Sequence, residues 1–230
     1  MSEVSAMPEQ APLHWHPVTS PTREILLGRY IDLEPLDPSR HGDDLWLALQ
    51  GPDSDPLLWD YLPYGPFPER TAFDAWLAGN AASADPQFYA VLDHASRRYV
   101  GLLSFLRITP KDGCIEIGHI AFGRAMQRSP ASTEAVYLLA KRAFDLGYRR
   151  LEWKCNSLNT RSMRAAERLG FTYEGTFRQH MVVKDRNRDS AWFSILDHEW
   201  PVRQQAFVTW LSGENFDAEG RQKQRLEDLR

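Results

Sequence analysis

The chain has 230 residues, of which 43% are apolar and 25% are charged, and its formal net charge at pH 7 is −4. This composition is typical of a globular protein that folds around one substantial core. The weakly acidic balance excludes a chain-wide basic surface for DNA, RNA or an anionic membrane, and no apolar run approaches the roughly 20 residues that span a bilayer.

The N-terminal region, residues 1–28, is rich in proline, serine and threonine, and we expect it to lie over the surface as an extension. It lacks the basic segment and apolar core of a secretory signal, so we expect a soluble, cytoplasmic protein. Cys114 and Cys155 lie far apart and inside apolar runs, which predicts two reduced, buried thiols. The seven histidines are scattered, and we expect no metal site.

The first half of the chain predicts one strand and two helices. Residues 29–36 alternate apolar and polar side chains, as a half-buried strand does. Residues 37–51 and 68–82 each predict an amphipathic helix, the first introduced by Asp37 and a proline. The segment 57–67 between these helices is dense in proline, glycine and aromatic residues and predicts no regular element.

Further along, three strands separated by turn residues predict an antiparallel meander, over residues 87–93, 99–109 and 114–123. An amphipathic helix, residues 131–147, follows and ends at a glycine. The pattern then predicts a strand, a helix and two strands joined by the charged turn K-D-R-N-R, over residues 148–156, 159–170, 171–183 and 189–200. In the last stretch, we expect Trp200, Phe207 and Trp210 either to close the domain or to bury themselves in a partner, which would make a homodimer.

This order of elements is typical of an α+β fold with one mixed, mostly antiparallel, seven-stranded sheet and helices on both faces. The β-α-β unit over residues 114–155 would make a right-handed crossover, so its two strands should lie parallel. We therefore predict a domain over residues 29–200, followed by a C-terminal helix and polar tail over 201–230.

The loop Q-R-S-P-A-S, residues 127–132, enters the long helix. A helix N-terminus has unpaired N–H groups and a partial positive charge, and therefore binds anions readily. Ser129 is a favourable N-cap, and Pro130 fits the first helical position. The N–H groups that remain for a phosphate are those of Ala131, Ser132 and Thr133, with Gln127 and Arg128 just before them. Taken alone, the loop is equally explained as a capped helix start with nothing bound.

Residues 115–178 resemble the GNAT superfamily of acyl-CoA-dependent N-acetyltransferases, and in particular its RimJ/RimL-like branch. The resemblance extends over about residues 25–200, and its most specific parts are E-I-G before the loop, S-T-E-A after it, N-x-x-S at 159–162 and the following A-E-R-L-G-F. The family's loop has the pattern Q/R-x-x-G-x-G/A. Here Gln127 has the first position, while Pro130 and Ser132 replace the two small residues.

The resemblance implies that acetyl-CoA is the co-substrate and that two central strands splay apart to hold its pantetheine arm. Its pyrophosphate would bind the loop amides, and its thioester carbonyl would meet a backbone N–H near Ile120 or Phe122. The coenzyme-binding residues that it implies are Ile120, Ala121, Phe122, Gln127, Arg128, Ser129, Ala131, Ser132, Thr133, Asn159 and Ser162.

The leaving CoA thiolate benefits from a proton. Many family members use a tyrosine for this, at the position that is Ala166 here, and the RimL-like branch suggests the hydroxyl of Ser162 instead. The alternative is that Asn159 and Ser162 only form a helix cap.

The attacking amine must lose a proton, and Glu116 is the first candidate for the base. Glu152, His119 and His180 are alternatives, and a mechanism without a dedicated base is another. Strand alternation places Glu116 and Gly118 on one face of the sheet and His119 on the other, so these residues should not all line the slot.

The segment 57–67 falls where this fold places a substrate-side wall. Its aromatic residues either line a pocket for the acceptor or pack on the core, and they are Trp59, Tyr61, Tyr64 and Phe67. The turn K-D-R-N-R-D either contacts an acidic substrate or is a solvated tip.

We expect direct transfer from acetyl-CoA to a primary amine, in a small molecule or at a protein N-terminus, because no cysteine lies beside an apparent base. A catalytically inactive CoA-binding sensor or interaction module is the alternative. A nucleotide-binding α/β domain is disfavoured by the antiparallel meander.

Overall fold

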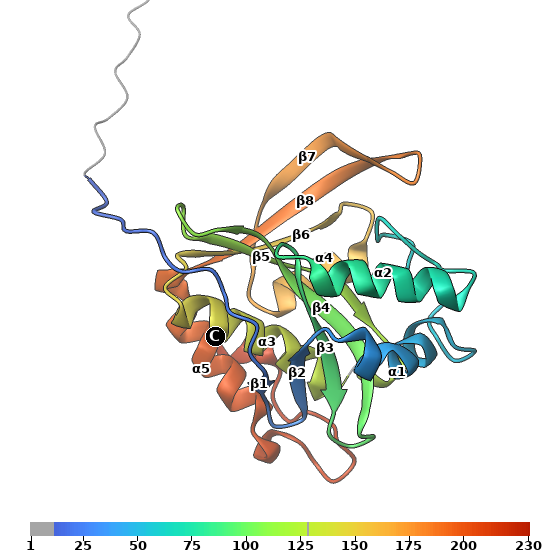
Figure 1. Cartoon of the computed structure of the whole chain (residues 1–230). Coiled ribbons are helices and arrows are strands. Elements are labelled where there is room, and N and C mark those ends of the chain that lie inside the picture. The colour runs from blue at the N-terminus through green and yellow to red at the C-terminus, as the bar shows by residue number, and fades with distance from the viewer. Residues whose placement is uncertain (1–11, 128) are drawn as a thin grey trace, which may run out of the picture.

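The structure is a computed structural model that describes residues 12–127 and 129–230. Its centre is an eight-stranded sheet in the order β1-β2-β3-β4-β5-β6-β8-β7, in which β5 and β6 are parallel and the other neighbours antiparallel (Figure 1). The strands are β1 (Leu26–Leu27), β2 (Ile31–Pro35), β3 (Gln87–Asp93), β4 (Arg98–Thr109), β5 (Cys114–Phe122), β6 (Arg150–Asn156), β7 (Thr172–Val183) and β8 (Arg186–Leu196). The α+β prediction is confirmed, with one more strand than expected because the two-residue β1 extends the sheet edge beside β2.

Helices cover both faces of the sheet. They are α1 (Pro38–Gln50), α2 (Arg70–Ala82), α3 (Pro130–Asp145), α4 (Thr160–Arg168) and α5 (Trp200–Leu211). Asp37 caps α1 by accepting a hydrogen bond from the Ser39 N–H, and proline occupies the first turn of α1, α3 and α5. The crossover through α3 joins β5 and β6, which are parallel, as expected.

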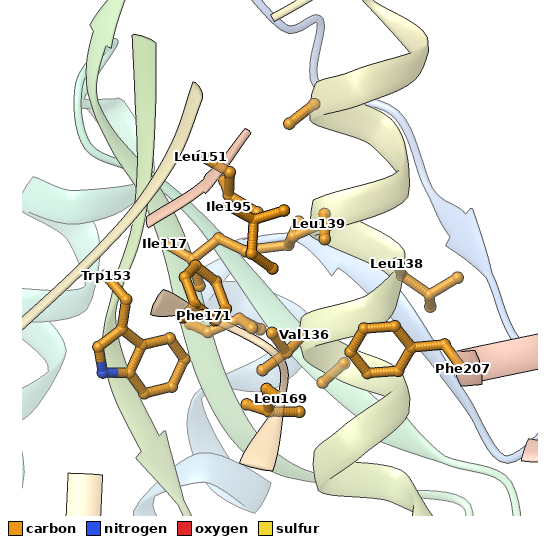
Figure 2. Close-up of a cluster of buried hydrophobic side chains, with 14 of the residues drawn as sticks. Ile117, Val136, Leu138, Leu139, Leu151, Trp153, Leu169, Phe171, Ile195 and Phe207 are labelled. Carbon is orange, nitrogen blue, oxygen red and sulfur yellow. The ribbon is translucent and has the colours of Figure 1, made fainter. Parts of the chain in front are cut away.

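The larger hydrophobic core lies between the sheet and the pair α3 and α5. Figure 2 shows side chains of β5, β6 and β8 meeting those of α3, with Phe207 of α5 beside them. Ile117, Leu151 and Leu139 are fully or almost fully buried here. This core holds the two strands next to the crossover in place.

A second core lies under α1 and α2 on the opposite face, and Leu45, Leu49, Phe73 and Leu77 provide its helical side. At the C-terminus, Trp200, Phe207 and Trp210 are buried in the chain's own core, so α5 closes the domain. Among the helices in the described ranges, none is long and apolar enough to cross a membrane.

The connection between β7 and β8 is shorter than the sequence predicts. Only Lys184 and Asp185 form the turn, with φ of +50° and +57°, and Val183 pairs directly with Arg186. Two residues with positive φ are typical of a type I′ turn, whose twist matches that of the strands. The rest of the charged segment K-D-R-N-R therefore belongs to β8, and Arg188 lies inside the sheet.

Candidate functional site

The parallel strands β5 and β6 are paired along only part of their length. Pairing runs from Cys114 opposite Arg150 to Ile117 opposite Trp153, and beyond that point the strands part. The rest of β5 pairs with β4 alone, and the rest of β6 with β8 alone. The predicted splayed central pair is thus confirmed, and each strand offers an unpaired backbone edge to the gap.

A β-bulge turns His119 toward the same side as Glu116. The register between β4 and β5 shifts so that His119 and Ile120 together oppose Leu103. His119 has a φ of +51°, and its Nδ1 lies 2.8 Å from the Tyr64 hydroxyl. The expectation that His119 and Glu116 face opposite sides is wrong, because the extra residue reverses the alternation, and both line one cavity.

A cavity of about 750 Å³ lies at this gap and extends to the start of α3. Its walls come from β4 to β8, from α3 and α4 with the residues just before them, and from the segment between α1 and α2. The expected site residues that line it are Tyr61, Glu116, Ile120, Phe122, Gln127, Ser132, Thr133, Asn159 and Ser162. The fold therefore brings together candidates from four separate parts of the sequence.

Several expected residues lie outside this lining. Ala121 is fully buried in the core under α1 and α2, while Ser129 and Ala131 belong to the start of α3 and their side chains do not line the cavity. Arg128 lies outside the described residues.

Three of the four aromatic candidates pack in the second core instead of lining the cavity. Trp59 is 3% exposed, and its Nε1 donates to the Leu49 carbonyl at 3.2 Å. The rings of Tyr64 and Phe67 contact that of Trp59, with centroids 6.0 and 5.4 Å away. Tyr61 lines the cavity, and its hydroxyl donates to a backbone carbonyl at 3.2 Å.

Among the described residues, no side chain caps the first turn of α3. Ser129 occupies the N-cap position, but its Oγ donates to the Met126 carbonyl at 2.8 Å. The Oγ of Ser132 donates to the Ser129 carbonyl at 3.0 Å. The backbone N–H groups of this turn are thus left for an acceptor from outside the helix, and the helix dipole favours an anion there.

At the start of α4, Asn159 forms the expected cap by accepting a hydrogen bond from the Ser162 N–H at 3.1 Å. The Oγ of Ser162 accepts a second bond, from Trp153 Nε1 at 3.1 Å. Because an indole nitrogen only donates, the hydroxyl of Ser162 keeps its hydrogen for an acceptor in the cavity. The sulfur of Cys155 is one such acceptor, since burial raises the pKa of this thiol and a hydrogen bond from Ser162 opposes that rise. The cap and a role toward a ligand are therefore compatible.

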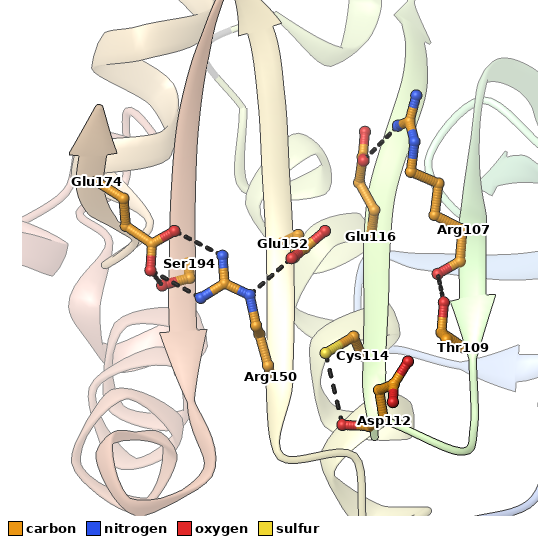
Figure 3. Close-up of polar contacts among 9 residues, drawn as sticks. All are labelled: Arg107, Thr109, Asp112, Cys114, Glu116, Arg150, Glu152, Glu174 and Ser194. Atoms are coloured by element: carbon orange, nitrogen blue, oxygen red, sulfur yellow. Dashed lines mark hydrogen bonds and ion pairs between the residues drawn. The ribbon is translucent and has the colours of Figure 1, made fainter. Parts of the chain in front are cut away.

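Glu116 is a buried carboxylate, 2% exposed, that is paired with Arg107 at 2.5 Å (Figure 3). Burial raises the pKa of Glu116 against the opposing effect of Arg107. The alternative base Glu152 accepts instead from Arg150 at 2.6 Å, in a separate network that Figure 3 also shows, and it does not line the cavity.

The two histidine candidates differ in position. Burial, assisted by nearby cations, lowers the pKa of His119 to about 4, so this imidazole is neutral at pH 7. His180 is exposed on β7, where its Nδ1 lies 2.9 Å from the Ser190 hydroxyl, outside the cavity lining.

Sequence reasoning missed the basic residues of the cavity, which are Arg107, Lys154, Arg161, Arg168 and Arg188. Burial lowers the pKa of Lys154 to about 8 and holds that of Arg188 below its usual range. The position of Lys154 could have been predicted from the alternation in β6. This strand buries every second residue on one face, and Lys154 lies on the other face. The sequence did not indicate Arg188, because the segment K-D-R-N-R to which it belongs is typical of a turn.

The segment 51–69 between α1 and α2 is tied to two other walls of the cavity. Asp55 accepts a hydrogen bond from Gln127 Nε2 at 3.2 Å, next to the start of α3. Tyr61 reaches the Leu158 carbonyl, next to the start of α4. Sequence reasoning did not single out Asp55, which has no pattern around it that indicates such a contact.

Comparison with protein families identifies an acetyltransferase (GNAT) domain over residues 32–172, which is more than half of the chain. A GCN5-related N-acetyltransferase from Brucella melitensis is 47% identical in sequence. Its structure superposes with a TM-score of 0.90, and the match covers 94% of this chain and 98% of that one.

Two further structures place the chain among similar folds. A probable GNAT acetyltransferase from Chromobacterium violaceum is 43% identical with a TM-score of 0.78, covering 87% of this chain and 100% of that one. An acetyltransferase from Salmonella typhimurium that modifies the N-terminal serine of ribosomal protein L7/L12 is 21% identical, with a TM-score of 0.62 over 75% of this chain and 99% of that one. The last likeness concerns the fold alone.

Proposed function

Because this chain belongs to the GNAT acetyltransferase family, we propose that it transfers an acetyl group from acetyl-CoA directly to a primary amine, in a small molecule or at a protein N-terminus. The chain is an acyltransferase by its family, whose members generally use acetyl-CoA. The observation that supports the proposal most is the uncapped first turn of α3, which opens onto the same cavity as the parted edges of β5 and β6.

The described residues fit this coenzyme at two places. The backbone N–H groups of Ala131, Ser132 and Thr133 would hold the pyrophosphate, with Ser129 setting the helix start. The unpaired edges of β5 and β6 would exchange main-chain hydrogen bonds with the amides of the pantetheine arm, and Asn159 lies beside them. When bound, acetyl-CoA supplies an activated thioester.

Ser162 and the bulged strand suit the acyl-transfer step. A backbone N–H near Ile120 or Phe122 would stabilise the negative charge that develops on the carbonyl oxygen. As the carbon–sulfur bond breaks and the carbon–nitrogen bond forms, the hydroxyl of Ser162 would give a proton to the leaving sulfur. Its orientation by Trp153 Nε1 supports this role.

Glu116 is the best candidate for the base that takes the amine proton. Its raised pKa brings it nearer to neutrality, whereas an imidazole with a pKa of about 4, such as that of His119, is a weak base. Its carboxylate lies at the cavity wall, where its negative charge would also attract the substrate's ammonium group before that group loses its proton.

A covalent intermediate is disfavoured by the state of the cysteines. Cys155 lines the cavity, but burial raises the pKa of its thiol, and burial also raises that of Cys114. The thiolate is the nucleophilic form, so neither cysteine is activated for attack on the thioester. The amine itself is then the attacking group.

Calorimetric titration with acetyl-CoA tests the coenzyme site. We expect micromolar binding, about −8 kcal/mol, in the wild type and its loss in Ser132→Glu, because the new carboxylate opposes the pyrophosphate at the start of α3. Thr71→Glu is the matched control, since it adds the same charge to the exposed first turn of α2.

Release of free CoA with a panel of amines and peptides then separates the two candidate functions. Transfer to any amine supports the enzyme, whereas tight binding of acetyl-CoA without transfer to any member would support a catalytically inactive binding module. Absence of acetyl-CoA binding in the wild type would contradict both.

A further inference from the structure

Three cations converge on the cavity from three different strands: Arg107 of β4, Lys154 of β6 and Arg188 of β8. The sheet register explains why. Lys154 pairs with Trp192, and Arg188 precedes Trp192 by four residues, so Lys154 and Arg188 share one face of the sheet. Glu116 lies on that face too, because it pairs with Glu152, two residues before Lys154.

Glu116 is the carboxylate at this end of the cavity, and it is already paired with Arg107. Within the part of the chain that the structure describes, the buried Lys154 Nζ and Arg188 Nε donate no hydrogen bond to any acceptor of the protein. The Lys154 ammonium lies 5.0 Å over the ring of Trp192, a contact that leaves its N–H groups unused.

Buried donors without acceptors carry a desolvation cost, and for charged groups that cost is larger. In native proteins such groups are generally satisfied, by protein, water or ligand. A single anionic group in the cavity could accept hydrogen bonds from both Lys154 and Arg188. Charge-assisted hydrogen bonds of this kind, to a carboxylate, are about twice as strong as neutral ones. The cavity therefore has a positive region beside the carboxylate of Glu116.

We propose that the acceptor of the acetyl group is an amine that also carries a carboxylate, and that Lys154 and Arg188 bind this carboxylate while Glu116 receives the amino group. This rests on the proposed acetyl transfer to an amine. Two sources share the required chemistry: a free amino acid, through its α-carboxylate, and a peptide N-terminus followed by an acidic side chain. Lys154 and Arg188 are then specificity-determining residues, and a simple alkyl amine is a poor acceptor.

Paired acceptors that differ in one carboxylate test the proposal. The first pair is alanine and alaninamide, and the second is two C-terminally amidated peptides with aspartate or asparagine after the N-terminal serine. We expect kcat/KM to be at least about tenfold higher for the carboxylate member of one pair, as two charge-assisted bonds allow. The pair that shows the preference identifies the source of the carboxylate.

Substitution of the two cavity cations tests whether they cause the preference for a carboxylate. Arg188→Gln and Lys154→Met should reduce the ratio of the two rates to about threefold or less, while Arg186→Gln should keep it. Arg186 is a matched control because it is exposed on the same strand and does not line the cavity. Calorimetric titration with acetyl-CoA checks that every variant is folded.

Binding of the same compounds to the complex with CoA, measured by calorimetry, separates this inference from the proposed function. Binding of a carboxylate compound that depends on Arg188, without any acetyl transfer, would support the anion site and contradict the transfer. Equal rates and equal binding for both members of each pair, or a preference that survives in both variants, would overturn the inference.

Discussion

The buried imidazole of His119 makes the stability of the protein depend on acidic pH. The pKa of His119 is about 4 in the folded chain, against 6.5 for an ordinary histidine. Between these values the unfolded chain binds the proton more readily, so this contribution to stability is complete above pH 6.5 and is lost as the pH falls toward 4. We expect the wild type to lose about 3 kcal/mol more than His119→Asn over this range.

Urea denaturation at a series of pH values measures this difference. Asparagine is a suitable replacement because it tolerates the left-handed backbone, with φ of +51°, at this position. The same pH dependence in both proteins would contradict the burial of His119 as the cause.

The hydroxyl of Ser162 is expected to affect catalysis more than coenzyme binding. In Ser162→Ala the leaving thiolate has no positioned proton donor, so kcat should fall by roughly 10²-fold, at the low end for general acid catalysis. The affinity for acetyl-CoA, measured by calorimetry, should change by no more than about threefold. Ser157→Ala is the control, since Ser157 does not line the cavity. A variant that keeps the wild-type kcat would exclude the hydroxyl as the donor.

Individual residues of the site could be predicted where a local pattern marks them. The N-x-x-S spacing indicated Asn159 and Ser162 because a helix cap is a local arrangement. The orientation of His119 could not be predicted, because a bulge depends on the register with a neighbouring strand. Lys154 and Arg188 come to one face only when β6 and β8 pair, and the sequence around each residue does not indicate that the other is near it.

Among the secondary-structure elements, α3 holds the edge of the sheet and also forms the end of the cavity where we propose that the coenzyme binds. Glu134 of α3 is 3% exposed and accepts hydrogen bonds from the N–H groups of Arg29, Tyr30 and Ile31, at 2.7, 2.7 and 3.1 Å. This contact attaches the start of β2 to the helix.

Removal of the Glu134 carboxylate should be strongly destabilising. Glu134→Ala leaves three backbone donors without an acceptor, and we expect it to lower the free energy of unfolding by about 3 kcal/mol or more, with Glu134→Gln in between. Urea denaturation measures both. Glu167→Ala, at an exposed position of α4, should change stability by less than about 0.5 kcal/mol. A similar small effect at Glu134 would mean that water replaces the carboxylate.

The helices and most strands could be predicted from periodicity, because each buries one face and begins or ends at a recognisable residue. The segment after β7 could not. Its charges are typical of a solvated turn, yet Arg186 pairs with Val183 and Arg188 enters the sheet. Backbone pairing with a long neighbouring strand outweighed the polar composition, as it commonly does for strand propensity.

For the molecule as a whole, the order of elements predicted the sheet well because most neighbouring strands are also neighbours in sequence. The exception is β6, which pairs with β8 and leaves β7 at the edge of the sheet. The parallel pairing of β5 and β6 follows from the crossover connection through α3. The size and lining of the cavity could not be predicted, since they depend on how far two strands separate and on which side chains a bulge redirects.

The short pairing between β5 and β6 also has a consequence for the folding of the chain. Glu116 belongs to the group of strands before the crossover, whereas Ser162, Lys154 and Arg188 come after it. The pairing that joins the two groups closes a long loop of chain, which is entropically more costly than forming a hairpin. Whatever the order of events, neither group alone contains all the residues of the proposed site, so the proposed chemistry requires that the two groups have docked.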